Sequence, residues 1–516
     1  MSKINRREFV TAVGAAAASM LAGRSVLGQS TTAATTTVPA KRPNILLIMS
    51  DEHDPAVSGC YGDGIARTPH LDRLAGEGIT FDAFYTTSPL CVPARLSFTA
   101  GKYVSRIGVW GNSCMLPSDD YPSLPHVLRA AGYRSYLAGR MDLDAEHRYG
   151  FEELYPDTEN RFRRTGLGKR RAADDAEPNA KAWQQRAKEF HPNEQSHAMT
   201  HDRRVTQACR EFFQDHQNDK QPFFLLAGYL APHFPLIAPQ EYYEHFKGKV
   251  PMPKIPEGFL DGMPTNYKHL RYAFGITEAT PEQIRIGREL YYGLVEWLDD
   301  QIGQVLKALE ESGLAGNTVV IYTADHGENR GEHGLWWKNC MYEQAARVPL
   351  IVRWPGRFKG GQRRGGAGSL VDLTQTIAGI AGAKTPADWN GDSLLPYMDN
   401  AGARWKDLAV SEYYGHNIAS GFAMIRQGPW KYVYHTRMDE KHGPERELYN
   451  LKDDPGEFHN LAGETAQKQR VAAMHATLVK ELGEDPDKAE ARCRASYAKG
   501  YGRGPRPAHA GSQASE

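Results

Sequence analysis

Three short, continuous apolar runs constrain the fold of this chain more than any other feature. They cover residues 45–49, 222–227 and 318–323. None of them alternates with polar residues, which is typical of strands covered on both faces in a parallel α/β sheet. The polar residues into which they lead are Asp51, His233 and Asp325. Because ligands bind at the carboxyl ends of the strands in open α/β sheets, we expect a functional site along that edge.

A long helix and a second group of strands complete the expected architecture. Apolar residues spaced three and four apart from Ile286 to Leu309 predict an amphipathic helix before the run at 318–323. This succession of helix, short turn, buried strand and carboxylate is typical of doubly wound folds. After about residue 395, short and partly alternating strands predict an antiparallel sheet. We therefore expect an α/β fold with a large doubly wound mixed sheet flanked by helices, and a smaller C-terminal antiparallel-sheet subdomain.

The two ends of the chain differ in composition from its middle. Paired arginines at positions 6 and 7 precede a mild, Ala-rich apolar stretch. This pattern predicts a twin-arginine-type signal peptide over 1–29, and hence export to the bacterial periplasm or the extracellular space. The predicted division of the rest is a linker at 30–40, a catalytic α/β domain at 41–395, a C-terminal α+β subdomain at 396–495 and a disordered tail at 496–516.

Composition argues against several classes of partner. Lys plus Arg equals Asp plus Glu at 62 each, so the charge balance predicts no nucleic-acid partner. No apolar run reaches the ~18 residues of a membrane span, so we expect no integral span. The six cysteines are too sparse for a disulfide framework. An insertion at 161–188, with nine Lys or Arg against three acids, is either a solvated loop or a lid that attracts a polyanionic substrate.

The stretch around Cys91 carries the most specific motif. Cys91, Pro93 and Arg95 form the minimal Cys-x-Pro-x-Arg pattern. Together with six further segments in order, it makes residues 41–461 resemble a type I, formylglycine-dependent sulfatase of the alkaline-phosphatase superfamily. The segments are 44–51, 91–95, 138–140, 232–233, 325–328, 334–338 and 447–461. Trp336, Trp337 and His326 make the chain most similar to the choline-sulfatase-like branch.

The resemblance implies hydrolysis of a sulfate monoester to an alcohol and inorganic sulfate through a metal-bound formylglycine, formed from Cys91 by a modifying enzyme. Negative charge builds on the bridging oxygen as the S–O bond breaks, so such a site needs a cation, fixed basic side chains and an acid. Imidazole titrates in the working range, which makes His233 the candidate acid. The implied catalytic residues are Cys91, Arg95, Lys102, Arg140, His233 and Lys338.

One divalent cation is implied by the same resemblance. Its ligands would be Asp51, Glu52, Cys91, Asp325 and His326. Oxygen ligands suit Ca²⁺, which is the first choice. His326 stands where most sulfatases carry Asn, and because imidazole is a softer ligand, Mn²⁺ becomes a competitor. Glu52 stands where most sulfatases carry Asp.

Arg140 and Asp142 depart from the Gly-Lys-x-His pattern of the family. Arg140 keeps the positive charge and adds a planar fork, whereas Asp142 adds a negative charge. Asp142 either pairs with Arg140 and restrains it, or contacts a hydroxyl or cation of the leaving group. We assign it to substrate binding, because buried polar groups reject analogues that leave them unpaired.

The substrate stays open at this level, between choline sulfate or another small molecule and a sulfated carbohydrate. A phosphonate or phosphate ester hydrolase on the same scaffold is the nearest alternative, because these esters share the tetrahedral geometry of sulfate. The other alternative is a catalytically silent protein that binds sulfated glycans, for which Asp142 is the only support. We expect the export machinery and a formylglycine-generating enzyme as protein partners.

Overall fold

The structure is a computed structural model that describes residues 42–143, 147–155 and 170–500. The predicted signal peptide, the linker, residues 161–169 of the basic insertion and the tail beyond residue 500 lie outside the described residues. In the described part, no helix is both long enough and apolar enough to cross a membrane. The six cysteines are all free.

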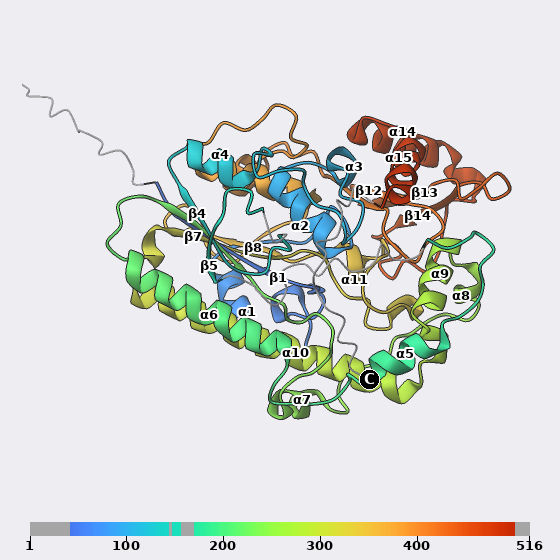
Figure 1. Cartoon of the computed structure of the whole chain (residues 1–516), viewed down its shortest axis with the longest axis horizontal. Helices are drawn as coiled ribbons and strands as arrows, with labels where there is room; N and C mark the ends of the chain where they lie inside the picture. The colour runs from blue at the N-terminus through green and yellow to red at the C-terminus, as the bar shows by residue number, and fades with distance from the viewer. Residues whose placement is uncertain (1–41, 144–146, 156–169, 501–516) are drawn as a thin grey trace, which may run out of the picture. The chain divides into compact units, whose positions relative to one another are not determined.

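An eight-stranded mixed sheet forms the centre of the described residues (Figure 1). The strand order is β5-β4-β6-β1-β7-β8-β2-β9, parallel from β5 to β7, with β8 antiparallel to both of its neighbours. The strands are β1 (Asn44–Ser50), β2 (Ile79–Phe81), β4 (Arg134–Gly139), β5 (Glu152–Tyr155), β6 (Phe223–Gly228), β7 (Thr318–Ala324), β8 (Leu350–Arg353) and β9 (Gln362–Arg364). The three predicted apolar runs are β6, β1 and β7, which lie side by side. Two short strands, β3 (Phe84–Tyr85) and β10 (Gly368–Ser369), pair separately.

Helices cover both faces of this sheet, because successive side chains of a strand point to opposite sides. Ile45 and Met49 of β1 belong to the core that includes α2, α4 and α12, whereas Leu46 and Ile48 belong to the core that includes α1, α6 and α10. These helices are α1 (Pro69–Gly76), α2 (Cys91–Ala100), α4 (Leu124–Ala130), α6 (His197–His216), α10 (Pro281–Glu311) and α12 (Leu370–Ile380). Figure 1 shows α6 and α10 along one face and α2 and α4 on the other.

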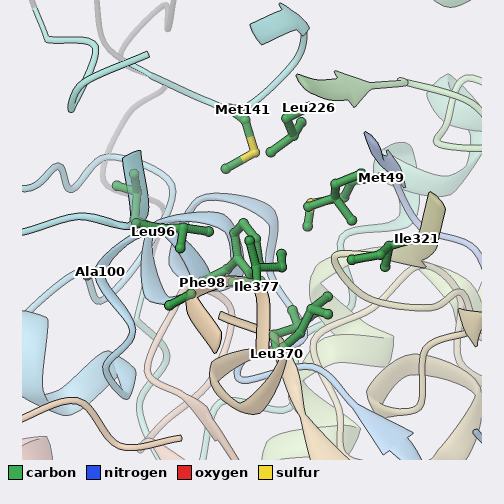
Figure 2. Packing of buried hydrophobic residues seen from close by; sticks show 14 of the residues in the cluster. Met49, Leu96, Phe98, Ala100, Met141, Leu226, Ile321, Leu370 and Ile377 are labelled. Atoms are coloured by element: carbon green, nitrogen blue, oxygen red, sulfur yellow. The ribbon is translucent and has the colours of Figure 1, made fainter. Parts of the chain in front are cut away.

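The core on the α2 side brings strands and helices together directly. Figure 2 shows Met49, Leu226 and Ile321, from three adjacent strands, near Phe98 of α2 and Ile377 of α12. All five are completely buried. Burying a side chain of this size stabilises the fold by roughly 1.5–3 kcal/mol, so this packing holds α2, and with it Cys91, firmly against the sheet.

Helix α10 corresponds to the predicted amphipathic helix and extends it at the N-terminus. Thr280 and Gln283 form a reciprocal capping box, and Pro281 occupies the first helical turn. The aromatic residues of this helix are core residues, as expected, and Trp297 is 2% exposed.

A four-stranded antiparallel sheet follows in the C-terminal region. Its order is β11 (Leu408–Tyr413), β12 (Phe422–Gln427), β13 (Trp430–His435) and β14 (Glu445–Asn450). Helix α14 (Lys468–Leu482) packs on it through Leu478, which shares a core with Val410 and Ile425. The predicted fold class is confirmed. Helix α15 (Pro486–Ala498) was not predicted, and it continues past residue 496, where we expected the tail to begin.

The remaining helices lie in the connecting segments. They are α3 (Val104–Ile107), α5 (Ala180–Ala187), α7 (Gln240–Phe246), α8 (Phe259–Gly262), α9 (Thr265–Ala273), α11 (Glu343–Ala346) and α13 (Leu395–Asp399). Helix α5 belongs to the described end of the basic insertion.

Candidate active site

The carboxyl ends of β1 and β7 bring two buried carboxylates together. The strands pair in parallel, with Ser50 opposite Ala324, so Asp51 and Asp325 follow at the same level of the sheet. The backbone N–H of Glu52 donates to Asp325 Oδ1 at 3.2 Å. Both carboxylates are inaccessible to solvent. The strand-end position predicted from the apolar runs is therefore confirmed for these two residues.

Cys91 is the first residue of α2, and the helix start points it at this edge of the sheet. Its Sγ lies 3.2 Å from His326 Nε2 and 3.8 Å from Asp51 Oδ1. His326 Nδ1 lies 3.1 Å from the Gly327 carbonyl, so Nδ1–H donates there and Nε2 faces the cluster. One side-chain donor atom from each of Asp51, Cys91, Asp325 and His326 lies within 4.8 Å of the others.

Arg95 lies one helical turn after Cys91 and connects the two carboxylates. Its Nε donates to Asp325 Oδ2 at 2.8 Å, and its Nη2 donates to Asp51 Oδ2 at 3.2 Å. The opposite oxygens face His326, whose Nε2 is 3.7 Å from Asp51 Oδ1 and 3.6 Å from Asp325 Oδ1. Arg95 therefore orients both carboxylates so that each presents one oxygen to the cluster.

Arg140, which follows the end of β4, contacts the carboxylate of Asp51. Its Nη1 lies 2.9 Å from Asp51 Oδ2, and its Nε and Nη2 pair with Asp142. The chain here passes close to β6, because a Cβ at Gly228 would lie only 1.9 Å from the Arg140 carbonyl oxygen. The structure thus places Asp142 against Arg140, the first of the two positions that the sequence left open. Its assignment to substrate binding stays a prediction.

Lys338 and His233 share one oxygen of Glu52. Lys338 Nζ lies 3.2 Å and His233 Nε2 3.3 Å from Glu52 Oε2. Glu52 Oε1 is buried and has no hydrogen-bond partner among the described residues. Glu52 also forms a second group of potential metal ligands with His233 and Asp51, and Asp51 belongs to the group that contains Cys91 as well.

Glu328 holds the loop that carries Lys338, a role that the sequence did not indicate. Its Oε1 accepts the backbone N–H of Trp337 at 2.6 Å and that of Arg330 at 2.8 Å. Asn329 adds a bond from its Nδ2 to the Trp337 carbonyl at 2.8 Å. Glu328 belongs to the segment 325–328 that resembles the family. The match does not identify the backbone groups that its side chain contacts, so this role could not be predicted.

Burial and neighbouring charges shift the pKa values of four residues of the site. Two of these pKa values are raised and two are lowered. Burial would raise the pKa of Asp51, but Arg140, His233 and Arg95 outweigh it and hold this pKa well below its usual range. Burial, followed by the charge of Asp51, raises the pKa of the Cys91 thiol. Burial and then Lys338 lower the pKa of His233. Burial raises the pKa of Glu52, although Lys338 acts against it.

Lys102 is the predicted catalytic residue that the structure does not bring to the cluster. Its Nζ lies 2.5 Å from Asp388 Oδ2 and 5.5 Å from the ring centre of Tyr121. Helix α2 separates it from the site, because its ten residues, at about 1.5 Å each, span about 15 Å. The structure therefore gives no support to a catalytic role for Lys102.

The donor set fits a divalent metal ion. Two carboxylates, an imidazole and the side chain at position 91 converge in a buried cluster. Hard divalent ions favour the carboxylate oxygens, and His326 adds the nitrogen donor that also suits manganese.

Comparison with known proteins identifies the family. A family model described as Sulfatase matches residues 43–383, and one described as N-sulphoglucosamine sulphohydrolase, C-terminal, matches residues 331–484. The chain therefore belongs to the sulfatase family and is a sulfuric ester hydrolase. A family of this kind implies in general a metal ion and a formylglycine.

Individual relatives support the same assignment. Choline-sulfatase of Rhizobium meliloti is 30% identical over an alignment of 448 residues, which covers 82% of this chain and 82% of its own. N-acetylglucosamine-6-O-sulfatase of Bacteroides thetaiotaomicron is 26% identical and covers 87% of this chain and 88% of its own. Among solved structures, the phosphonate monoester hydrolase of Agrobacterium radiobacter shares the fold with a TM-score of 0.70 at 22% identity, over 86% of this chain and 96% of its own.

Proposed function

We propose that this sulfuric ester hydrolase uses a formylglycine, formed from Cys91, as the nucleophile, with one divalent cation held by Asp51, Asp325, His326 and the modified residue 91. The observation that carries the proposal is the meeting of these four side chains, with their donor atoms within 4.8 Å of one another. Calcium is the first choice for the ion, and manganese the second because of His326.

The surrounding side chains have distinct tasks in this scheme. When bound, the cation supplies positive charge that lowers the pKa of the hydrated aldehyde and favours its attack on sulfur. Arg95 holds the two carboxylates in place from the side away from the cluster. Arg140 and Lys338 bind the sulfate oxygens, and His233 donates the proton that the leaving alcohol needs.

A polar organic sulfate ester is the proposed substrate class. A choline-sulfatase and an N-acetylglucosamine-6-O-sulfatase are both relatives, so a small cationic ester and a sulfated sugar each have support. A phosphonate or phosphate ester is the second candidate function. It is favoured by His326, which resembles the residue of phosphonate monoester hydrolases, and by the similarity of the fold to such an enzyme.

Export through the twin-arginine route belongs to the same proposal. The paired arginines at positions 6 and 7 support it, and the final location would be the bacterial periplasm or the extracellular space. Since proteins on this route leave the cytoplasm folded, the formylglycine-generating enzyme would act on Cys91 before export.

Mass spectrometry of the protein purified from its native host tests the nucleophile. We expect the peptide spanning residues 88–95 to carry an aldehyde or its hydrate at position 91, and the Cys91→Ala variant to release no sulfate. Only thiol in fully active protein would refute the mechanism. Steady-state rates on aryl sulfates, phosphate diesters and phosphonates separate the two functions, and elemental analysis of the active protein identifies the ion.

A further inference from the structure

Arg186, in the last turn of α5, is a half-buried cation without an acidic partner in the described part of the chain. Its Nη1 donates to the Ala182 carbonyl at 3.5 Å, which is its one hydrogen bond among the described residues. Burial lowers the pKa of Arg186, and no carboxylate opposes this effect. Other arginines of the basic insertion are paired, Arg170 with Glu490 and Arg171 with Asp175. Because a buried charge without a counterion is costly, Arg186 calls for a separate explanation.

The guanidinium of Arg186 lies over the aromatic residue that precedes the catalytic lysine. Its central carbon is 4.9 Å from the ring centre of Trp337 and 5.2 Å from that of Phe274. Trp337 also packs against Phe234, at 5.9 Å, and Phe234 follows His233 in the chain. The cation therefore lies beside the loop that carries Lys338, and this loop packs against the residue that follows His233.

His416 approaches the same place from the connection between β11 and β12. Asn339 Nδ2 donates to the Tyr413 hydroxyl at 2.9 Å, and this hydroxyl donates to the His416 carbonyl at 2.9 Å. The residue after Lys338 thus anchors the loop of His416. The half-buried imidazole has no hydrogen-bond partner among the described residues, and burial, then Lys338 and Arg186, lower its pKa to about 4.

We infer that Arg186 and His416 bind a second anionic group of the substrate, a carboxylate or a second sulfate, next to the ester sulfate at Lys338. An anion would compensate the unpaired guanidinium, and a neutral imidazole can donate an N–H to it. The inference rests on the proposed function, and it narrows the substrate to a sulfate ester with at least one further negative charge.

The same geometry disfavours a quaternary ammonium ester. Recognition of such a cation requires exposed aromatic faces, and here Arg186 covers those of Trp337 and Phe274. Arg186 and Lys338 also place two positive charges where the cationic group would have to bind, which is unfavourable by Coulomb's law.

Paired aryl sulfates test the inference with the purified, metal-loaded, formylglycine-bearing enzyme. The probes are 2-, 3- and 4-sulfooxybenzoate, each compared with the matching carboxamide, which has the same shape and no second charge. For the sulfooxybenzoate that is hydrolysed best, we expect kcat/KM to exceed that of the matching carboxamide by about tenfold or more. One charge-assisted hydrogen bond is sufficient for a difference of this size. In Arg186→Gln this ratio should fall to near one, because the KM for the carboxylate should rise much more than the KM for the carboxamide.

Three further measurements complete the design. Arg186→Lys should recover part of the preference, and His416→Gln should reduce it less than Arg186→Gln does. Arg203→Gln is the matched control, because Arg203 also lies over a tryptophan, 6.0 Å from the ring centre of Trp297, but in α6. Calorimetric titration of the inactive Cys91→Ala variant with the same probes measures binding without turnover, and should show the same order of affinities.

Several results would overturn the inference while leaving the proposed function intact. One is a wild-type enzyme that hydrolyses aryl sulfates without preferring any carboxylate. Another is an equal loss of rate on carboxylates and carboxamides in Arg186→Gln, which would make Arg186 structural. A third is faster hydrolysis of choline sulfate than of every dianionic probe. If the wild type hydrolyses no sulfate ester at all, the proposed function fails and this inference fails with it.

Discussion

Arg140 and Asp142 form a bidentate ion pair at the edge of the buried cluster of Asp51, Cys91, Asp325 and His326. The Nε–Oδ1 distance is 2.7 Å and the Nη2–Oδ2 distance is 3.3 Å, while Arg140 Nη1 remains 2.9 Å from Asp51. Two of the three guanidinium nitrogens are thereby held by Asp142. The pair keeps the planar group in a single orientation, which a lysine at this position could not achieve with one donor atom.

Loss of the Asp142 charge should loosen Arg140. We expect Asp142→Asn to lower kcat/KM by about tenfold on every sulfate ester, as loss of a charge-assisted bond costs about 1.5–3 kcal/mol. Steady-state kinetics on several leaving groups measure this. A loss confined to substrates with one particular polar group would instead show that Asp142 contacts the substrate. Glu152→Gln is the control, since it breaks the exposed bidentate pair with Arg134, which contributes little.

Asp325→Asn should separate metal binding from folding. The amide oxygen can still accept the N–H groups of Glu52 and His326, so we expect the protein to remain folded by circular dichroism. The lost charge should reduce both the amount of bound metal and the turnover rate. Replacing a residue that only hydrogen-bonds a metal ligand costs up to roughly 100-fold, and we expect a larger loss here. Elemental analysis and initial rates check both. Full metal content in the variant would remove Asp325 from the ligand set.

Glu52→Gln should give the opposite pattern, because Glu52 Oε2 faces Lys338 and His233. We expect metal content close to that of the wild type and a kcat lower by about tenfold, the effect of about 1.4 kcal/mol on the barrier. The rate should fall because Lys338 and His233 would lose the carboxylate that both of them contact. A large loss of metal would instead make Glu52 a ligand, as the sequence analysis first assigned it.

Stability should fall as pH rises from about 4.5 to about 7, in part through Glu412. Burial raises the pKa of Glu412 from 4.5 to about 7. Between these values the folded protein binds more protons than the unfolded chain, so the free energy of unfolding decreases with pH. The shift corresponds to about 3 kcal/mol at most.

Urea denaturation at pH 4.5 and pH 7.5 measures this effect for the wild type and Glu412→Gln. The variant resembles the protonated acid, so its stability should change less between the two pH values. Burial also raises the pKa values of Asp299 and Glu457 to about 7, and these two residues are the same in both proteins. The difference in pH dependence between the variant and the wild type therefore measures the contribution of Glu412. Equal pH dependence of the two proteins would mean that Glu412 ionises normally.

The three central strands of the main sheet, and the carboxylates that follow two of them, were accessible from sequence for a local reason. A run such as residues 45–49 is apolar on both faces because helices cover both sides of its strand, and that requirement is written in consecutive residues. Asp51 and Asp325 were predictable because each follows such a run directly. Helix α15 was missed, because its alanine-rich sequence offers only a weak apolar stripe.

Sequence by itself therefore determined the three central strands, the long helix, the motif at Cys91 and the residue types expected to bind a cation. Tertiary structure alone decided that Arg95 joins Asp51 to Asp325, that Lys102 faces Asp388, and that Arg186 lies over the ring of Trp337. Strand and helix patterns are periodic over a few residues and can be read locally. The partner of a charged side chain, by contrast, lies tens to hundreds of positions away, and it is selected only when packing brings those segments together.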